Sequence, residues 1–561
     1  MLSNASPGIM INDTKKKGWC LLVIISLLLG TMISYVGGNT VSTSFILDDY
    51  DPLVNICVTL MIKAICSLES NDTSSSDFYV KAGINNESFT SPIWHNKDYV
   101  YPDWHATVDV PDEVEYVNIT IELWDHNEGR DILCDINGNL GNPLNYRHVN
   151  LVYSIKTGCW AGEDHLGDMS GYGRLNGCGD GTIYNTDRDC ELWFSLYQND
   201  YGNDGLSYWM EIMDYGTNPS IDNTGKDYDE DGIPIEWEHK WGFNPVSWDD
   251  HMHLDSDNDS LTNTEEYLTR RFGSDPFRRD LFLELDFMKN ENNRSVNIVS
   301  QDALELLKNP FHRRDILFFI MIDGFFPFDD FTDQEALLDI YQTFFLTDEE
   351  NMWKRSVFHY GIFAYDCIPT GYSYAGDGPV FWGYVPGTNG FIVSQTQMEK
   401  YNRLRPDLTL DYFHASVIMH EIGHHFGIRF GNPYGCDNHF GKYPWQLSYW
   451  IFGTYKSIMN YRYTYQILDY SDGSHGKRDF DDWGYMNLSY FEKNTSTCTY
   501  GDQSLKLKNT IQENIRSDDI PSRQEPIKKY LEREIIAKTL ETIRTGLDEQ
   551  KTTKHIDPAY H

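Results

Sequence analysis

Positive charge is scarce in this chain. Among its 561 residues, 45 lysines and arginines stand against 85 aspartates and glutamates, which gives a formal net charge of −40. Such a surface would repel nucleic-acid phosphates, so the composition argues against a nucleic-acid partner and favours bound cations or a saline, exposed setting. Aromatic residues, at 14%, are too frequent for a disordered acidic tail. The sequence therefore predicts a globular, acidic protein, and its length predicts about two to four domains.

Long hydrophobic runs are also scarce, because only residues 19–36 form one. This uncharged run of about 18 residues follows three consecutive lysines, and its length lies between that of a signal-peptide core and that of a spanning helix. The basic flank is expected to stay inside the cell, so the chain beyond it is exported. We therefore expect residues 1–40 to be a signal peptide or a signal-anchor. The protein would then be extracellular, either secreted or anchored to the outer face of the cell membrane.

Cysteine pairs with the spacing of a metal finger are absent. The chain has 10 cysteines and no C-x-x-C pair, which makes a thiolate zinc finger improbable. In an exported chain some cysteines are expected to form disulfides, although their spacing does not determine the connectivity.

Residues 45–197 consist of short alternating stretches separated by Gly, Asn, Asp and Pro. Alternation of polar and apolar residues predicts half-buried strands, and several such strands in succession predict a β-sandwich. The expected strands are residues 77–84, 105–110, 116–125, 149–155 and 190–197.

One loop of this region is rich in oxygen ligands. The stretch ELWDHNEGRDILCDI places Asp125, Asn127, Asp131 and Asp135 between two expected strands. Together with the stretches SSDFYV and YPDW, it resembles the calcium-binding C2 sandwich of protein-kinase-C type. The resemblance implies a calcium site at Asp125, Asp131 and Asp135, and a solvated acidic turn is the alternative.

Residues 198–277 contain a threefold internal repeat. Twelve-residue loops begin at Asp200, Asp227 and Asp255, with acids at positions one, five and twelve, and each unit ends in a G-x-[ND]-P turn. The first loop has Gly202 where the other two have an acid at position three. This spacing wraps oxygen ligands around calcium, and the units resemble thrombospondin type-3 modules, with three solvated acidic loops as the alternative. The expected calcium ligands are Asp200, Asp204, Glu211, Asp227, Asp229, Asp231, Glu238, Asp255, Asp257, Asp259 and Glu266.

Residues 278–500 change to strands that alternate with helices, which predicts an α+β domain with a mixed sheet. The fold class is therefore multi-domain, with a sandwich, calcium-loop repeats and an α+β domain. The expected strands are residues 281–288, 316–324, 359–366, 380–385 and 391–398, and a helix is expected at residues 302–309.

The stretch MHEIGHHFG contains HExxH, a zinc-site motif. His420 and His424 lie four residues apart, so on a helix their rings project from one face and can share a metal ion. Glu421 stands where a carboxylate can take a proton from a metal-bound water. Asp411 is the expected N-cap of this helix.

This motif, the strands before it and SIMNY at residues 457–461 together resemble the metzincin metalloproteases. The resemblance implies that Met459 forms a Met-turn beneath the metal and that Tyr461 helps to stabilise an oxyanion. The order of sandwich, calcium repeats and metzincin-like domain also resembles exported metalloproteases of archaeal type.

The sequence departs from the metzincin pattern at the third zinc ligand. The pattern expects His or Asp three residues after Gly427, where this chain has Phe430, and a phenyl ring cannot ligate zinc. The third ligand must then come from the loop that follows. His439 is preferred and Asp437 is the close alternative, while His475 is a weaker candidate.

Three further features are left open. His425 points about a hundred degrees away from His424 and is expected to pack or to support the site. Residues 501–561 form a charged extension in which residues 527–543 predict an amphipathic helix. An acidic group could bind calcium or be a solvated loop; its members are Asp469, Asp472, Asp479, Asp481 and Asp482.

Two functions follow from these patterns. The first is an exported zinc endopeptidase that cleaves proteins or peptides, with Glu421 as general base and calcium as a stabilising ion. The second is a non-catalytic, calcium-stabilised surface or adhesion protein with a degenerate peptidase domain, which Phe430 keeps open. The expected cofactors are zinc and calcium.

Overall fold

The computed structural model describes the chain from Tyr50 to Leu488 with gaps. The described residues are 50–68, 76–111, 113–139, 147–164, 173–181, 183, 188–289, 298–328, 339–346, 353–366, 382–385, 390–429 and 431–488. The chain divides into two compact units, residues 1–48 and 49–561, and every described residue lies in the second. No helix of this described part is long and apolar enough to cross a membrane. The expected export segment, Phe430 and residues 501–561 lie outside the described residues.

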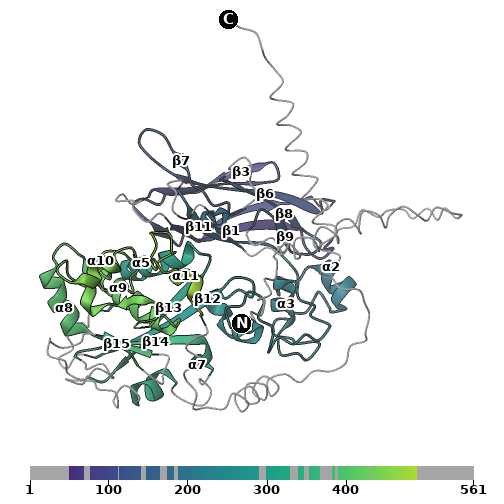
Figure 1. Ribbon diagram of the computed structural model, residues 1–561. Coiled ribbons are helices and arrows are strands. Elements are labelled where there is room, and N and C mark those ends of the chain that lie inside the picture. The colour runs from purple at the N-terminus through teal and green to yellow at the C-terminus, as the bar shows by residue number, and fades with distance from the viewer. Residues whose placement is uncertain are drawn as a thin grey trace, which may run out of the picture. The chain divides into compact units, whose positions relative to one another are not determined.

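Two antiparallel sheets form the N-terminal part of the described chain (Figure 1). The first sheet has the order β10-β11-β1-β4, with β5 also paired to β1, and the second has the order β3-β2-β6-β8-β9, with β7 paired to β6. The strands of the first are β1 (Cys57–Ser67), β4 (Tyr99–Val100), β5 (Trp104–Asp109), β10 (Arg174–Asn176) and β11 (Cys190–Gln198). The strands of the second are β2 (Phe78–Ile84), β3 (Glu87–Thr90), β6 (Tyr116–Asp125), β7 (Ile132–Leu133), β8 (Val149–Ser154) and β9 (Trp160–Gly162).

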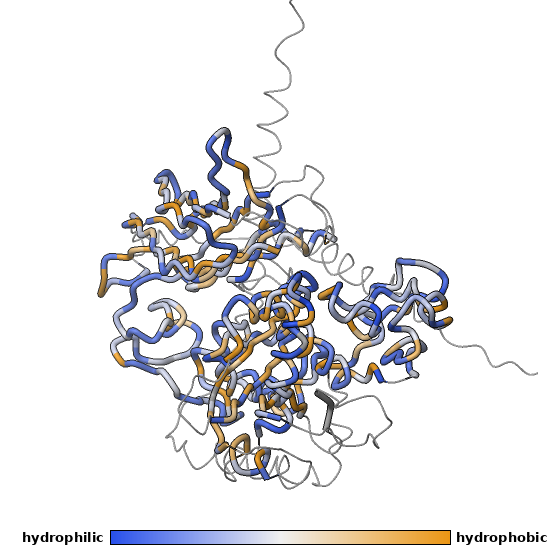
Figure 2. Tube along the Cα trace, turned by 90° about the vertical axis from the view of Figure 1, so that its left-hand side faces the viewer, coloured by the Kyte–Doolittle hydropathy of each residue, from blue (hydrophilic) through white to orange (hydrophobic). Residues whose placement is uncertain are grey.

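Alternation along the strands builds the core of this sandwich. On β6, Val117, Ile119, Ile121 and Leu123 are fully buried, while the residues between them are at least partly exposed. Figure 2 shows the same separation, with hydrophobic residues along the strands and hydrophilic residues in many connecting loops. The antiparallel sandwich predicted from the sequence is confirmed. Strand β1, which pairs with three others, was not among the expected strands.

The repeat region consists of loops and short helices. The helices are α2 (Tyr208–Met210), the π-helical turn η2 (Glu211–Tyr215), α3 (Ile235–Trp241), α4 (Asn263–Thr269) and η3 (Arg270–Phe272). Gly216, Gly242 and Gly273 each end a unit with a positive φ of 69°, 74° and 92°. A left-handed residue closes a helix best when it is glycine, which explains why every G-x-[ND]-P turn begins with one.

A five-stranded mixed sheet follows, in the order β13-β12-β14-β16-β15, in which only β15 runs antiparallel to its neighbour. Its strands are β12 (Asp280–Met288), β13 (Leu317–Phe326), β14 (Phe358–Ala364), β15 (Trp382–Val385) and β16 (Gly390–Ser394). The strand expected at residues 391–398 is therefore too long. Ser394 accepts a hydrogen bond from the backbone of Gln397, at 3.4 Å, and this cap starts helix α8 (Gln395–Leu404).

Helices cover both faces of this sheet. On one face α5 (Gln301–His312) and α9 (Leu410–His425) pack on each other and on the strands (Figure 1). On the other face the aromatic residues of η4 (Tyr341–Phe345) pack near α7 (Lys354–Val357). The remaining elements are β17 (Tyr434–Asp437), η6 (His439–Gly441), α10 (Leu447–Ile451) and α11 (Asp482–Tyr485), with η1 (Gly177–Asp180) in the sandwich.

Candidate metal centre

Helix α9 carries the HExxH motif. Thr409, rather than the expected Asp411, is its N-cap, because the Thr409 hydroxyl accepts the backbone N–H of Tyr412 at 3.2 Å. The helix is buried almost all round from Phe413 to Gly423, so apolar packing on the sheet and on α5 fixes its position. Gly427, with φ of 94°, lies directly beyond its end.

The two histidines of the motif are held by backbone carbonyls. His420 Nδ1 lies 3.0 Å from the Ile458 carbonyl and His424 Nδ1 lies 2.7 Å from the Ile428 carbonyl. A carbonyl only accepts, so each Nδ1 carries the proton and donates it. Because Nδ1 is engaged with a carbonyl, Nε2 is the ring nitrogen that is left to face the centre, and it is the atom through which each ring would ligate a metal.

Asp437 faces the Nε2 atoms of both rings. Its Oδ1 lies 3.0 Å from His420 Nε2 and 3.7 Å from His424 Nε2. A tetrahedral ion with bonds of about 2.0–2.1 Å separates its ligand atoms by about 3.3 Å, so these three atoms fit around one zinc. Burial raises the pKa of Asp437, but His424, His420 and a hydrogen bond with Tyr461 together outweigh it and hold the pKa well below its usual value.

The turn that contains Met459 places Asp437. The backbone N–H of Asp437 donates to the Met459 carbonyl at 2.9 Å, and the neighbouring Ile458 carbonyl holds His420. Met459 is fully buried beneath α9, where its sulfur occupies the space that a Cβ on Gly423 would need. One turn thus orients two metal-ligand candidates at once.

Glu421 and Tyr461 complete the group. A carboxylate oxygen of Glu421 and ring nitrogens of His420 and His424 all lie within 4.8 Å of one another. The Tyr461 ring lies against His420, with centroids 5.5 Å apart and planes 25° apart. The structure therefore brings together His420, Glu421, His424, Asp437 and Tyr461.

Other sequence candidates lie around this group rather than in it. His439 packs on Tyr461, with ring centroids 4.8 Å apart. His475 pairs instead with Asp479 at 2.9 Å and Asp472 at 3.7 Å. His425 faces away from the centre and stacks on His359, with centroids 5.0 Å apart.

The other acids near the Met-turn have separate structural partners. Asp482 accepts the Tyr455 hydroxyl at 2.8 Å, Asp469 accepts the Trp483 indole at 3.0 Å, and Asp481 caps α11. Burial, above all, raises the pKa of Asp482 to about 7.

An apolar rim lies in the stretch between α9 and the Met-turn. We use "aromatic rim" for its exposed members, which are Tyr434, Phe440, Tyr443, Trp445, Leu447 and Trp450, with exposed fractions from 43% to 80%. Residues 434–450 contain one acid, Asp437, and that acid is buried. No motif or periodicity of the sequence predicted the aromatic rim.

The three repeat loops share one backbone geometry. The residues at position four, Asn203, Glu230 and Asn258, all have a positive φ between 60° and 64°. The first acid of each loop accepts backbone N–H groups from positions four and six, as Asp227 does from Glu230 at 2.7 Å and Gly232 at 2.8 Å. The carboxylates of Asp227, Asp229 and Asp231 offer ligand oxygens within 4.8 Å of one another. The loops are therefore folded to collect carboxylates.

Collected carboxylates repel one another. Burial and then the neighbouring Asp204 raise the pKa of Glu211 to about 7, and burial with Asp231 and Asp227 raises that of Asp229 to about 7. In the third loop, burial raises the pKa of Asp257 to about 7 and that of Glu266 well above its usual value. A bound cation would remove this repulsion.

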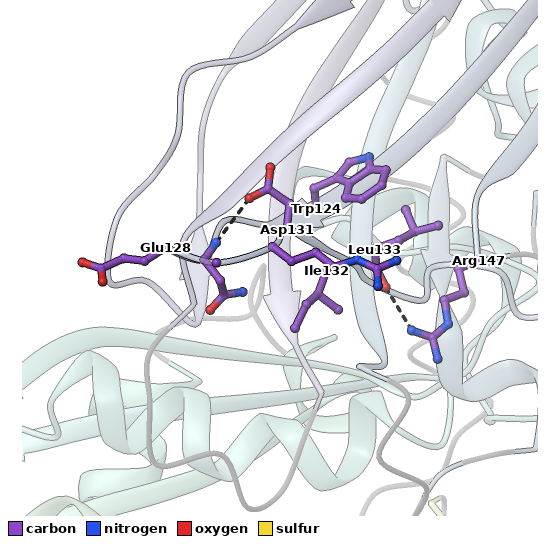
Figure 3. A pocket seen from close by; sticks show the side chains of 9 residues that line it. Trp124, Glu128, Asp131, Ile132, Leu133 and Arg147 are labelled. Carbon is purple, nitrogen blue, oxygen red and sulfur yellow. Dashed lines mark hydrogen bonds between the residues drawn. The ribbon is translucent and has the colours of Figure 1, made fainter.

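The acids of the sandwich loop have protein partners. Asp125 pairs with Arg188 at 3.0 Å, Asp131 accepts the Tyr79 hydroxyl at 2.7 Å, and Asp135 lies 4.0 Å from Arg147. Figure 3 shows Asp131 and Arg147 beside a hollow of about 930 Å³ that Trp124, Glu128, Ile132 and Leu133 also line. Each of these carboxylates therefore has a basic or hydroxyl partner of its own.

Five described cysteines are free thiols, namely Cys57, Cys66, Cys134, Cys159 and Cys436. The disulfides expected of an exported chain are therefore not seen at these positions.

Comparisons with known proteins find partial structural likenesses. No family model matches the chain and no curated protein matches it. A C2 domain is 12% identical, with a TM-score of 0.16 over 26% of this chain and 98% of that chain. A C2 domain of plant extended synaptotagmin 1 has 12% identity and a TM-score of 0.16 over 26% and 96% of the two chains. Human GIVD cytosolic phospholipase A2 has the same identity and TM-score over 26% and 16%. Each likeness concerns about a quarter of this chain, and no functional conclusion follows from it.

Proposed function

We propose that this chain is a zinc-dependent endopeptidase of metzincin type. The observation that carries the proposal is the convergence of His420 Nε2, His424 Nε2 and Asp437 Oδ1, with both imidazoles fixed in the ligating tautomer by backbone carbonyls. Two neutral imidazoles and a carboxylate are a donor set that zinc accepts, and they leave a fourth position for water.

Asp437 is the third ligand in this proposal. It replaces the preferred candidate, His439, whose ring packs on Tyr461 while the Asp437 carboxylate faces both histidines. With a ligand supplied after the helix, Phe430 no longer argues for a degenerate site. The non-catalytic alternative then has no observation in its favour.

Zinc at this site would lower the pKa of a water molecule towards neutrality and polarise a substrate carbonyl. Glu421, adjacent to both ligands on α9, accepts the proton of the attacking water and then delivers it to the leaving amine. Tyr461, which hydrogen bonds to Asp437 and packs on His420, would turn its hydroxyl to the substrate and stabilise the negative charge that develops on the carbonyl oxygen.

The aromatic rim is the proposed binding surface for the substrate. It is continuous with the centre, because Phe440 follows His439, which packs on Tyr461. Exposed aromatic side chains without nearby negative charge favour apolar or aromatic side chains of an extended peptide. The proposed substrates are therefore polypeptides with such residues near the cleaved bond.

Calcium is proposed to bind the repeat loops where all donors are oxygens. The support is the shared loop backbone and the raised pKa values of Glu211 and Asp257, which a dication would reverse. For the sandwich we propose a C2-type fold, on its loop pattern and its two antiparallel sheets. Export and anchoring through residues 19–36 remain part of the proposal.

The test is cleavage of casein by the purified chain, with and without a zinc chelator, beside Glu421→Gln. The expected result is activity that the chelator abolishes and that Glu421→Gln lowers by about 10²–10⁴-fold, because the general base is lost. Glu399→Gln, a half-exposed glutamate of α8 paired with Arg403, is the matched control and should retain activity. Full activity in Glu421→Gln would overturn the mechanism.

A further inference from the structure

The second repeat differs from the other two in having a buried imidazole at its carboxylates. His251 is fully buried, and its Nε2 lies 3.2 Å from Asp231 Oδ2 and 3.6 Å from Glu238 Oε1. Trp237 and Phe243 hold the ring in place with edge-on contacts at 6.0 Å and 5.0 Å between centroids. The imidazole is thus aimed between positions five and twelve of the loop.

The other loops have different groups at the same place. In the first loop the Asn223 amide nitrogen lies 3.0 Å from Asp204 and 2.8 Å from Glu211, the corresponding acids. In the third loop the backbone N–H of Asp280 contacts Asp259 at 2.6 Å. A nitrogen atom that can ligate a metal therefore occurs in the second loop alone among these three.

The hydrogen bonds of this cluster are incomplete. Both carboxylate oxygens of Glu238 and Nε2 of His251 are fully buried, and among the described residues they meet one another only at ion-pair distance, without a well-directed hydrogen bond. Buried polar atoms of this kind almost always have a partner, and a buried carboxylate without one is costly. A metal ion that takes all three atoms as ligands would satisfy them.

Asn263 can fix the ring for that role. Its side-chain amide nitrogen lies 2.8 Å from His251 Nδ1, the amide is fully buried, and its oxygen has no hydrogen bond among the described residues, so a half-turn of the amide brings the oxygen to the ring. With the amide oxygen turned to the ring, Nδ1 donates to it and the lone pair of Nε2 faces Asp231 and Glu238. This is the support that metal-ligating histidines usually have on their other nitrogen.

We propose that the second repeat binds a borderline transition-metal dication, such as zinc or cobalt(II), through Asp231, Glu238 and His251. Calcium selects oxygen donors, whereas a site with one imidazole and two carboxylates suits zinc-like ions. The separations of 3.2 Å and 3.6 Å bracket the value of about 3.3 Å expected between ligands of a tetrahedral zinc. The ion would connect His251, which follows α3, to Asp231 in the loop before this helix.

The experiment measures cobalt(II) binding to the zinc-free full chain in excess calcium, by its visible absorption and by metal analysis. The parent variant is His420→Ala with His424→Ala, which removes the catalytic centre. We expect it to bind one equivalent of cobalt(II), and we expect His251→Ala in that background to lose this equivalent. His253→Ala is the matched control, because His253 is exposed and pairs only with Asp250 among the described residues.

Two outcomes would overturn the proposal. If His251→Ala still binds one equivalent of cobalt(II), His251 is not a ligand. If the parent variant binds no cobalt(II), calcium fills the second loop and His251 does not contact the ion. His251→Gln, which keeps an amide at the ring position, repeats the test if His251→Ala does not fold. In the chain that keeps His420 and His424, His251→Ala should reduce the bound cobalt(II) from two equivalents to one. A failure of the proposed peptidase centre would leave the His251-dependent signal unchanged, so the two outcomes can be distinguished.

Discussion

The centre on α9 and the repeat loops differ in the groups that surround each carboxylate. On α9, two imidazoles face one carboxylate, and these neighbours hold the pKa of Asp437 below its usual value. In the loops, carboxylates face carboxylates, and burial raises the pKa of Asp229 to about 7. The first site is organised by backbone carbonyls before any metal binds, whereas the loops depend on a cation to offset their own repulsion.

The largest expected effect separates the two candidates for the third ligand. Asp437→Ala should weaken zinc binding by at least about 100-fold, since loss of a supporting contact alone costs up to that much. His439→Ala should change it by less than about threefold, because the ring packs on Tyr461. Zinc affinity measured by competition with a chelator provides the comparison. The reverse ranking would restore His439 as the ligand.

Removal of calcium should destabilise the protein more than removal of zinc. A site that is saturated at about 100 times its Kd contributes about 2.7 kcal/mol, and each calcium loop adds such a contribution. At the same saturation the single zinc centre adds one such contribution, whereas the two loops with only oxygen donors add two. Thermal unfolding after selective chelation of each metal checks this order. Asp257→Asn, which removes one buried charge, should reduce the calcium dependence.

The stability of the calcium-free protein should depend on pH because the pKa values of buried loop carboxyls are raised. The pKa values of Glu211 and Asp257, in the first and third loops, are raised to about 7 from usual values near 4, so between about pH 4 and pH 7 the folded state binds more protons than the unfolded state. Stability should therefore fall as the pH rises from about 4 to 8, and calcium should remove the fall. Unfolding temperatures across this range, with and without calcium, measure it. If the calcium-free protein became more stable between about pH 4 and pH 8, the proposed repulsion between the loop carboxylates would be contradicted.

The smallest effect concerns the aromatic rim. Trp445→Ala should raise KM several-fold for peptides with aromatic residues and leave kcat little changed, because the indole would bind substrate without contacting the reacting atoms. Trp248→Ala, an exposed tryptophan of the repeat region, is the matched control. Equal changes of KM in the two variants would show that the aromatic rim does not bind substrate. Binding of an uncleaved peptide to Glu421→Gln gives a second measurement.

Local patterns predicted the elements of the fold better than their ends and their partners. Alternation identified β6 and β8 because one face of each is buried, and the loop repeat was readable because ligand spacing is local. Strand β1, by contrast, mixes buried and exposed residues around a bulge near Ile62, which obscures its period. The end of β16 was misplaced because the cap at Ser394 starts α8 earlier than hydropathy indicates.

The sequence by itself determined the two histidines, the glutamate and the three acidic loops, because one helical turn or one loop carries all the information about their spacing. Only the tertiary structure placed Asp437 rather than His439 at the histidines, since that choice depends on a backbone hydrogen bond to Met459. Likewise, only folding brought His251 to Asp231 and Glu238, which are 20 and 13 residues before it. Contacts between separate loops are set by packing, and no local periodicity encodes them.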